Sequence, residues 1–243
     1  MRIVAILQAR MGSTRLPGKS MLPLAGKPMV TNIVERVCRA TRLDAVVLAY
    51  PLADHDAMMT ALDQRADDER DRPIGIYASQ DPEQDLVARY LSAATAHSAD
   101  LIVRICCDNP CIEPEYIDEA IRQYRLFPSV YYSNTTDAVS RGSFAEGTFH
   151  NIFVDGIGCE VFSISRLKWL DDDTRAYPVE GQREHIHRRF QDAAHGGFTL
   201  LPADIRLDVN TEADYLFIKE IYDHFGHNRF HITDVLDYLD SKK

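Results

Sequence analysis

The sequence lacks an apolar run long enough to cross a membrane. A spanning helix needs roughly 18 consecutive apolar residues, and the apolar segment at residues 3–7 is much shorter and is bounded by Arg2 and Arg10. It is also too short for a secretory signal, so we expect a cytoplasmic protein with no membrane partner.

Excess positive charge is absent too. A net charge of −10 over 243 residues argues against a nucleic-acid-binding surface.

Two familiar phosphate-binding motifs are also missing. The dinucleotide fingerprint G-x-G-x-x-G does not occur, and the P-loop spacing G-x4-G-K-[ST] fails because five residues separate Gly12 from Gly18. Prolines that follow Lys19 oppose the helix that a P-loop requires there. These absences exclude a dehydrogenase of the Rossmann type and a P-loop kinase.

Cysteine is sparse, and its spacing gives no metal or disulfide framework. The chain has five cysteines, an odd number, and no C-x2-C pair. The cluster of Cys106, Cys107 and Cys111 follows an apolar segment, so we interpret it as core packing at the end of a strand and not as a zinc knuckle. All five are expected to be reduced thiols.

Strand-like and helix-like segments alternate through the first half of the chain. Strands are predicted at 2–8, 45–50, 74–77 and 101–105, and helices at 29–41, 54–67, 82–96 and 114–125. This order predicts an α/β fold, a mostly parallel Rossmann-like sheet flanked by helices. Later elements are expected at 130–133, 157–162, 163–170, 181–192, 204–207, 211–225 and 232–240. Asp81 is the predicted N-cap of the third helix, and Thr211 with Asp214 resembles a capping box.

The loop at residues 8–19 carries the sharpest functional signal. It reads Gln-Ala-Arg-Met-Gly-Ser-Thr-Arg-Leu-Pro-Gly-Lys and leaves the carboxyl end of the first strand, where open α/β sheets bind ligands. Small residues such as Gly12 and Ser13 expose backbone N–H groups that can cradle phosphate oxygens. The loop adds three charge-assisted donors: Arg10, Arg15 and Lys19.

The charge distribution agrees with a polyanion site near this loop. Residues 1–42 hold eight basic residues and one acid, a net charge of +7, which leaves −17 for the other 201 residues. A small basic segment on an acidic body favours a compact anion such as a triphosphate. An ordinary solvated surface loop is the alternative interpretation.

These segments resemble the cytidylyltransferases, and most closely the SpsF-type branch named for spore-coat polysaccharide synthesis. CMP-KDO and CMP-sialate synthetases have a similar loop and are more distant. The resemblance begins at residues 3–30 and continues in order through DLVARY at 85–90, RICCDNP at 104–110, CEVFS at 159–163, REH at 183–185 and LDVNTEADY at 207–215.

The resemblance implies a fold of the nucleotide-diphospho-sugar transferase type and a Mg²⁺-dependent activity. CMP would pass from CTP to a sugar-acid or phosphorylated sugar-like acceptor, with release of pyrophosphate, in surface polysaccharide or glycoconjugate synthesis. Relatives are commonly homodimers. We expect one domain over 1–243, with nucleotide binding in about 1–127, acceptor and dimer contacts in about 128–205, and a return to the core in 206–243.

The loop and the resemblance together predict the site. The expected catalytic residues are Arg10, Lys19, Asp108 and Asp208. The expected nucleotide contacts are Leu7, Gln8, Ala9, Arg10, Gly12, Ser13, Arg15, Lys19 and Asp85. Backbone groups near residues 6–9 are expected to read the cytosine.

Two carboxylates are predicted to hold Mg²⁺. Asp108 and Asp208 each follow an extended segment, and carboxylates at strand ends can neutralise phosphate charge through Mg²⁺. The residues alone also allow a turn at Asp108 and a helix cap at Asp208. The resemblance selects the metal interpretation for both.

Three other positions stay open. Asp85 and Arg89 have i, i+4 spacing, which favours an intrahelical ion pair over a ligand contact. His185 has either an acceptor-pocket or a structural role, and its spacing from His187 does not suit zinc. Gly158 stands where relatives often carry an acid, which affects acceptor choice.

Two rival functions remain. A UTP- or GTP-dependent nucleotidyltransferase would use the same chemistry, but such relatives usually begin with a Leu-Ala-Gly-Gly-type loop. A non-catalytic nucleotide-binding protein on the same fold is the second rival. The joint presence of Arg10, Lys19, Asp108 and Asp208 argues against it.

Overall fold

The computed structural model describes residues 1–66, 72–126, 132–133, 154–179, 183–184 and 205–243. Half of the extended piece expected at 130–133, and most of the helix expected at 181–192, with His185, lie outside the described residues. Residues 183 and 184 form a turn.

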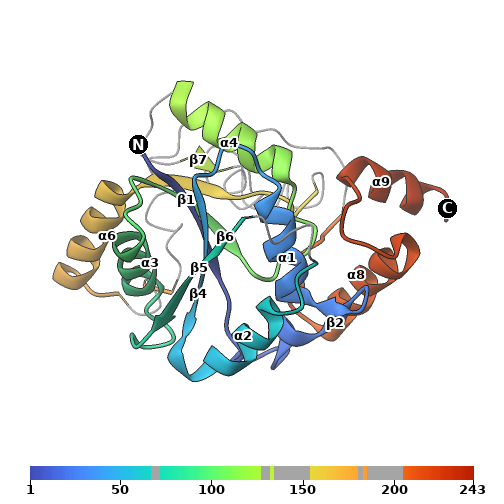
Figure 1. The fold of residues 1–243 in the computed structure, drawn as a ribbon, viewed down its shortest axis with the longest axis horizontal. Helices are drawn as coiled ribbons and strands as arrows, with labels where there is room; N and C mark the ends of the chain where they lie inside the picture. Colours follow the sequence, from blue (N-terminus) through green and yellow to red (C-terminus); the bar gives the residue numbers. More distant parts are fainter. Residues whose placement is uncertain (67–71, 127–131, 134–153, 180–182, 185–204) are drawn as a thin grey trace.

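A six-stranded sheet forms the centre of the molecule (Figure 1), in the order β5-β4-β1-β6-β8-β7. Its first four strands are parallel, β8 runs antiparallel to β6, and β7 runs antiparallel to β8. The strands are β1 Ile3–Gln8, β4 Ala45–Pro51, β5 Ile74–Ser79, β6 Leu101–Cys106, β7 Tyr132–Ser133 and β8 Glu160–Ser163. The predicted mostly parallel α/β sheet is confirmed.

Helices cover both faces of the sheet. Their bounds are α1 Met29–Cys38, α2 His55–Leu62, α3 Leu86–Ala96, α4 Pro114–Leu126, α6 Ile164–Ala176, α8 Glu212–Phe225 and α9 Ile232–Asp240. α3 and α6 pack on one face, and α1, α2, α4, α8 and α9 pack on the other (Figure 1). Residues of β1 alternate between the two cores: Ile3, Ala5 and Leu7 face one, Val4 and Ile6 the other. Period-two alternation is what a two-sided buried strand requires.

The start of α3 differs from the prediction. Asp81 does not cap this helix, because its carboxylate bonds to the Ser79 hydroxyl, which in turn accepts from the Asp81 N–H. Asp85 is the N-cap, and its carboxylate accepts from the Ala88 N–H at 3.0 Å. Pro82 therefore lies in the turn before the helix. The Asp81 carboxylate is bonded locally to Ser79 and is therefore not available to cap the helix.

Short elements follow the N-terminal loop. A single 3-10 turn, Lys19–Met21, leads into the small hairpin of β2 Pro23–Leu24 and β3 Lys27–Pro28. The prolines thus prevent a P-loop helix, as expected. A second 3-10 turn, Leu52–Asp54, follows β4 and places Asp54 beside the loop.

The C-terminal segment returns to the centre of the molecule. Arg206 forms a parallel bridge with Asp155, and the Val209 N–H donates to the Asp108 carbonyl at 2.7 Å. α8 then begins with the predicted capping box of Thr211 and Asp214. This return brings residues 208–210 to the carboxyl ends of β1 and β6.

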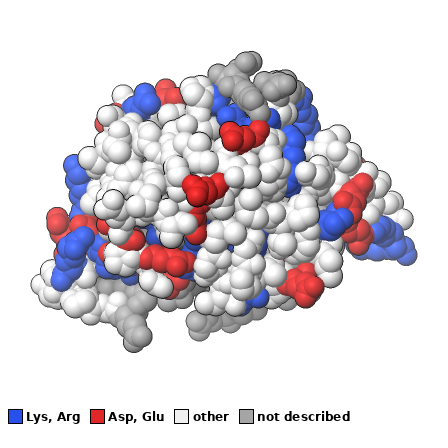
Figure 2. Space-filling model, turned by 60° about the horizontal axis from the view of Figure 1, so that its bottom comes forward, with Lys and Arg blue, Asp and Glu red and all other residues white. Residues whose placement is uncertain are grey.

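Charge is distributed in small groups on the face that carries these strand ends. Figure 2 shows blue and red side chains interspersed among white ones on this face. On the part of this face that the structure describes, no continuous basic surface forms. No helix within the described residues is long and apolar enough for a membrane span.

Candidate active site

The loop after β1 is fixed at both ends by hydrogen bonds. The Ala9 N–H donates to the Ala49 carbonyl at 3.1 Å, and the Met11 N–H donates to the Asp54 carboxylate at 2.9 Å. At the far end the Gly18 N–H donates back to the Met11 carbonyl at 3.0 Å. Gly18 has φ +70°, a left-handed conformation that glycine adopts without strain. The loop therefore closes on itself over residues 11–18.

Between these anchors the backbone donors are free. Among the described residues, the N–H groups of residues 12–16 donate no hydrogen bond to the protein. Consecutive free N–H groups in a turn form a concave anion-binding site. The loop thus has the donors that a polyphosphate needs.

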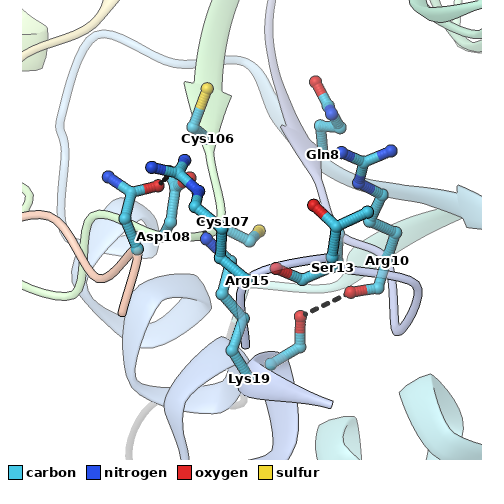
Figure 3. Close-up of a pocket in the computed structure, with 12 residues that line it drawn as sticks. Gln8, Arg10, Ser13, Arg15, Lys19, Cys106, Cys107 and Asp108 are labelled. Atoms are coloured by element: carbon cyan, nitrogen blue, oxygen red, sulfur yellow. Dashed lines mark hydrogen bonds and ion pairs between the residues drawn. The ribbon is translucent and has the colours of Figure 1, made fainter. Parts of the chain in front are cut away.

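A cavity of about 130 Å³ lies between this loop and the end of β6 (Figure 3). Gln8 and Arg10 stand on one side of it, and Cys106 and Asp108 on the other. Its lining residues are Gln8, Ala9, Arg10, Ser13, Thr14, Arg15, Lys19, Ser20, Cys106, Cys107, Asp108 and Asn210. The structure therefore brings Gln8, Ala9, Arg10, Ser13, Arg15, Lys19 and Asp108 together, as predicted.

Lys19 joins the two walls of this cavity. Its Nζ donates to the Asp108 carboxylate at 3.1 Å and to the Val209 carbonyl at 2.7 Å. The side chain is only 12% exposed. Arg15 is exposed and reaches across the cavity to the Asn210 side-chain oxygen at 2.6 Å. Both cations line the cavity and bind adjacent residues of the C-terminal return.

Arg10 lies between two carboxylates that the sequence did not single out. Its two terminal nitrogens are 3.5 Å from a Glu83 oxygen and 3.4 Å from a Glu184 oxygen. The Ser20 hydroxyl donates to the Arg10 carbonyl at 3.1 Å. The REH motif was the one available signal for Glu184, and nothing in the sequence pattern pointed to Glu83.

The carboxylates beside the cavity suit a divalent cation. Burial raises the pKa of Asp208, and the neighbouring Asp155 and Asp108 carboxylates raise it further, against the opposing effect of Arg206. Arg206 and Asn210 occupy the Asp208 oxygens in this structure. Excess negative charge at one place is what Mg²⁺ neutralises. Asp108 lines the cavity and Asp208 does not, and the Asp208 oxygens are bonded to Arg206 and Asn210, so the two carboxylates do not converge on one point in this structure.

Comparison with known proteins decides the family. A sequence model described as cytidylyltransferase matches residues 4–195. This chain belongs to the cytidylyltransferase family. It is therefore an enzyme of CTP-dependent nucleotidyl transfer, as the sequence predicted.

Relatives and solved structures agree. The spore coat polysaccharide biosynthesis protein SpsF of Bacillus subtilis is 28% identical over 92% of this chain and 88% of its own length. The 3-deoxy-manno-octulosonate cytidylyltransferase of Geobacter sulfurreducens is 38% identical, but the match spans 54% of this chain and about half, 48%, of that protein. A cytidylyltransferase structure from Leptospira borgpetersenii matches with a TM-score of 0.77 at 24% identity, covering 100% of this chain and 95% of the other.

Three predicted contacts of this cytidylyltransferase lie outside the cavity lining. Leu7 is buried in the core, and Gly12 packs its backbone against the Glu83 carboxylate. Asp85 caps α3 and binds Arg183. The expected ion pair of Asp85 with Arg89 is wrong. The Arg89 guanidinium is fully buried and donates to the Glu83 carbonyl instead.

The end of β1 is where this cytidylyltransferase is predicted to read the base. β1 is paired on both sides, the Gln8 carbonyl accepts from the Cys107 N–H, and the Ala9 N–H is bonded to Ala49. The strand's own backbone groups and the Ala9 N–H are therefore bonded within the sheet, whereas the Ala9 carbonyl accepts no hydrogen bond from the described residues. The Gln8 side chain lines the cavity, and its Oε1 is buried without a hydrogen-bond partner. Both oxygens lie at the end of β1 with free bonding capacity.

The cysteines of this cytidylyltransferase are free thiols, as predicted. Cys106 lines the cavity, yet burial raises its pKa to about 12. A raised pKa disfavours the thiolate, which is the nucleophilic form of cysteine. Cys107, Cys111 and Cys159 are buried and pack in the core.

Proposed function

We propose that this enzyme transfers CMP from CTP to a sugar-acid or phosphorylated sugar-like acceptor and releases pyrophosphate, with Mg²⁺ as cofactor. The observation that supports it best is the loop of residues 8–19, whose free N–H groups and three cations surround a cavity at the end of β1. That arrangement suits a triphosphate, because several N–H donors and three cations can contact several phosphate oxygens at once. A smaller anion would need fewer donors.

The chain's own residues would bind and orient the triphosphate. The free N–H groups of residues 12–16 and the cations Arg15 and Lys19 contact phosphate oxygens, which replace the Asn210 and Asp108 contacts of this structure. An acceptor oxygen then forms a bond to the α-phosphorus, the bond from that phosphorus to the β-phosphate oxygen breaks, and the acceptor proton passes to solvent. Positioning and charge neutralisation carry such a displacement.

Asp108 and Asp208 are the residues that would hold Mg²⁺. When bound, the ion would neutralise phosphate charge and orient the leaving group. Asp208 must first exchange its bonds to Arg206 and Asn210 for the ion.

The acceptor class comes from the names of relatives. One matched protein is called a spore coat polysaccharide biosynthesis protein, and several are called 3-deoxy-manno-octulosonate cytidylyltransferases. We propose a comparable acidic or phosphorylated acceptor in surface polysaccharide synthesis. A cytoplasmic homodimer remains part of this proposal, as does the division into nucleotide and acceptor regions.

Nucleotide choice is tested without knowing the acceptor. Thermal unfolding is measured with Mg²⁺ and each of the four nucleoside triphosphates. CTP should raise the melting temperature at concentrations where UTP and GTP do not, because a site that hydrogen-bonds the cytosine amine leaves groups unpaired with uracil. Equal shifts from CTP and UTP would contradict the choice of CTP.

The reaction itself is tested by pyrophosphate release. CTP and Mg²⁺ are incubated with a panel of acidic and phosphorylated sugars, and each sugar is also tested without enzyme. We expect release with a subset of acidic acceptors. A chain that binds CTP and releases no pyrophosphate with any of them would support the non-catalytic rival.

A further inference from the structure

Arg183 joins three parts of the molecule through its side chain. Nε donates to the Asp85 carboxylate at 2.9 Å, and Nη1 donates to the Thr174 hydroxyl at 2.7 Å. Nη2 is 2.6 Å from the Asp171 carboxylate and 2.8 Å from that of Asp85. The guanidinium thus ties the N-cap of α3 to one face of α6. Short contacts to two carboxylates fix its position tightly.

The backbone of Arg183 is fixed to the same helix. Its carbonyl accepts from the Leu86 N–H at 3.1 Å and from the Val87 N–H at 3.3 Å. These are first-turn donors of α3, which have no partner within the helix. Residue 183 is therefore held to α3 by its side chain and by its carbonyl at once.

The next residue extends this anchored backbone to the active site. The Glu184 carboxylate is 3.4 Å from Arg10 Nη2, while the Glu83 carboxylate is 3.5 Å from Nη1. Glu83 also lies just before α3, and its carbonyl accepts from the buried Arg89. Both carboxylates that flank Arg10 are thus held at the N-terminal end of α3. Glu83 directly precedes this helix, and Glu184 is held there through Arg183.

We propose that Arg183 is a positioning residue for nucleotidyl transfer: it fixes Glu184 beside Arg10, which holds the Arg10 guanidinium at the wall of the phosphate cavity. Arginine has a flexible side chain, and fixing it before the ligand arrives removes part of the entropic cost of binding. The inference rests on the proposed function, because it assumes that the cavity receives a polyphosphate.

A purely structural role for Arg183 predicts a different outcome. It would change the free energy of unfolding and leave phosphate binding unaffected in the folded protein. The two roles separate in a double-mutant cycle of Arg183→Ala, Glu184→Ala and the double variant. Two quantities are measured: the Kd for inorganic tripolyphosphate by calorimetry, and kcat and KM for CTP in pyrophosphate release.

Each single variant should weaken tripolyphosphate binding and raise KM for CTP about 2- to 10-fold, the range expected for immobilising one long side chain. The double variant should be no weaker than the worse single variant, because Arg183 acts through Glu184. Glu184→Gln keeps an oxygen acceptor for Arg10 and should recover most of the affinity. Urea unfolding should show a loss for Arg183→Ala and almost none for Glu184→Ala.

Arg175→Ala is the matched control. Arg175 binds the same Asp171 carboxylate at 3.0 Å from the exposed side of α6, and among the contacts the structure describes it has none with Asp85 or Glu184. Its removal should leave tripolyphosphate binding unchanged. A loss equal to that of Arg183→Ala would show that α6 charge, not the placement of Glu184, is responsible.

Three results would overturn the proposal: single effects that multiply in the double variant, tighter tripolyphosphate binding by Glu184→Ala than by the wild type, or no tripolyphosphate binding by the wild type. The tripolyphosphate measurement involves neither base nor acceptor. A wild type that binds tripolyphosphate but releases no pyrophosphate from CTP would therefore refute the proposed function. The tripolyphosphate affinities of the variants would still decide whether Arg183 is a positioning residue.

Discussion

Lys19 and Arg15 are cations of one loop, yet their surroundings differ. Replacing either with alanine should remove a charge-assisted phosphate contact worth about 1.5–3 kcal/mol, or about 10- to 150-fold in kcat/KM. Lys19 is 12% exposed and bonds to Asp108 and Val209, so Lys19→Ala should also lower the free energy of unfolding by about 1–3 kcal/mol.

Arg15→Ala serves as the stability control, because Arg15 is exposed and its loss should change unfolding by less than about 0.5 kcal/mol. Steady-state kinetics and urea unfolding of both variants check these expectations. Wild-type CTP affinity in both would contradict the assignment of the phosphate loop.

Asp108 and Asp208 should be required for the metal dependence. Asp108→Asn and Asp208→Asn keep the side-chain size but weaken Mg²⁺ coordination, so turnover should fall by at least about 100-fold. EDTA should abolish wild-type activity and Mg²⁺ should restore it. Asp118→Asn is the control. Asp118 accepts from Thr41 and Arg42, and it should keep the Mg²⁺ response. Near-normal turnover in either site variant would leave that aspartate as a turn or cap residue.

Residue positions were predictable where one local pattern decides them. Arg10, Lys19 and Asp108 follow strand ends, so the α/β topology placed them together. Asp85 was assigned wrongly as a partner of Arg89, because its partner Arg183 lies 98 residues away. The bonding of the backbone at residues 6–9 has a related non-local cause. The neighbours of β1 in the sheet, not its own residues, use up its N–H and C=O groups.

Among the elements, the extended segment that leads to Asp208 passes close against a single glycine of the neighbouring segment. Gly156 has φ +83°, and a Cβ there would lie 2.6 Å from the Asp208 backbone nitrogen. Gly156→Ala should therefore push residues 207–208 away from Asp155, lower the free energy of unfolding by about 2–4 kcal/mol, and reduce turnover.

Gly226→Ala is the matched control. Gly226 ends α8 at φ +70°, and an added Cβ there would meet no described atom within 4 Å, so only the backbone strain of about 1–2 kcal/mol applies. Its turnover should stay at the wild-type level. Equal losses of turnover in both variants would show that general destabilisation, not the position of Asp208, accounts for the effect.

Element boundaries were predictable where capping chemistry is local. The Thr211 box fixed the start of α8 as expected. α3 begins four residues later than predicted, because Asp81 is bonded to Ser79 and Asp85 caps the helix instead. Residues 206–207 form a bridge with Asp155 that no local pattern specifies.

On the scale of the whole molecule, one buried arginine links the N-terminal part of the chain to the C-terminal part. Arg36 of α1 donates to the Glu113 carboxylate at 2.8 Å and also to the carbonyls of Asn228 and Phe230, which precede α9. Burial raises the pKa of Glu113 from 4.5 to about 7. Arg36 and His231 oppose this effect, and Glu115 adds to it.

The raised pKa predicts a pH dependence of stability. The folded state binds this proton more tightly than the unfolded state, so the stabilisation is complete below about pH 4.5 and is lost as pH rises through about 7. Relative to Glu113→Gln, the wild type should lose on the order of 2–3 kcal/mol of unfolding free energy between pH 5 and 8. Urea unfolding at several pH values measures this difference. Parallel curves for the two proteins would contradict it.

The return of residues 209–210 to the cavity sets an order in time on the ribosome. The loop, β1 and β6 are synthesised by residue 108, but Val209 and Asn210, which bind Lys19 and Arg15, follow about 100 residues later. At about 5–20 residues per second, the nascent sheet waits roughly 5–20 s for its second wall. During that interval Lys19 and Arg15 lack their C-terminal partners. A ligand that needs both walls therefore meets a complete cavity only after translation has passed residue 210.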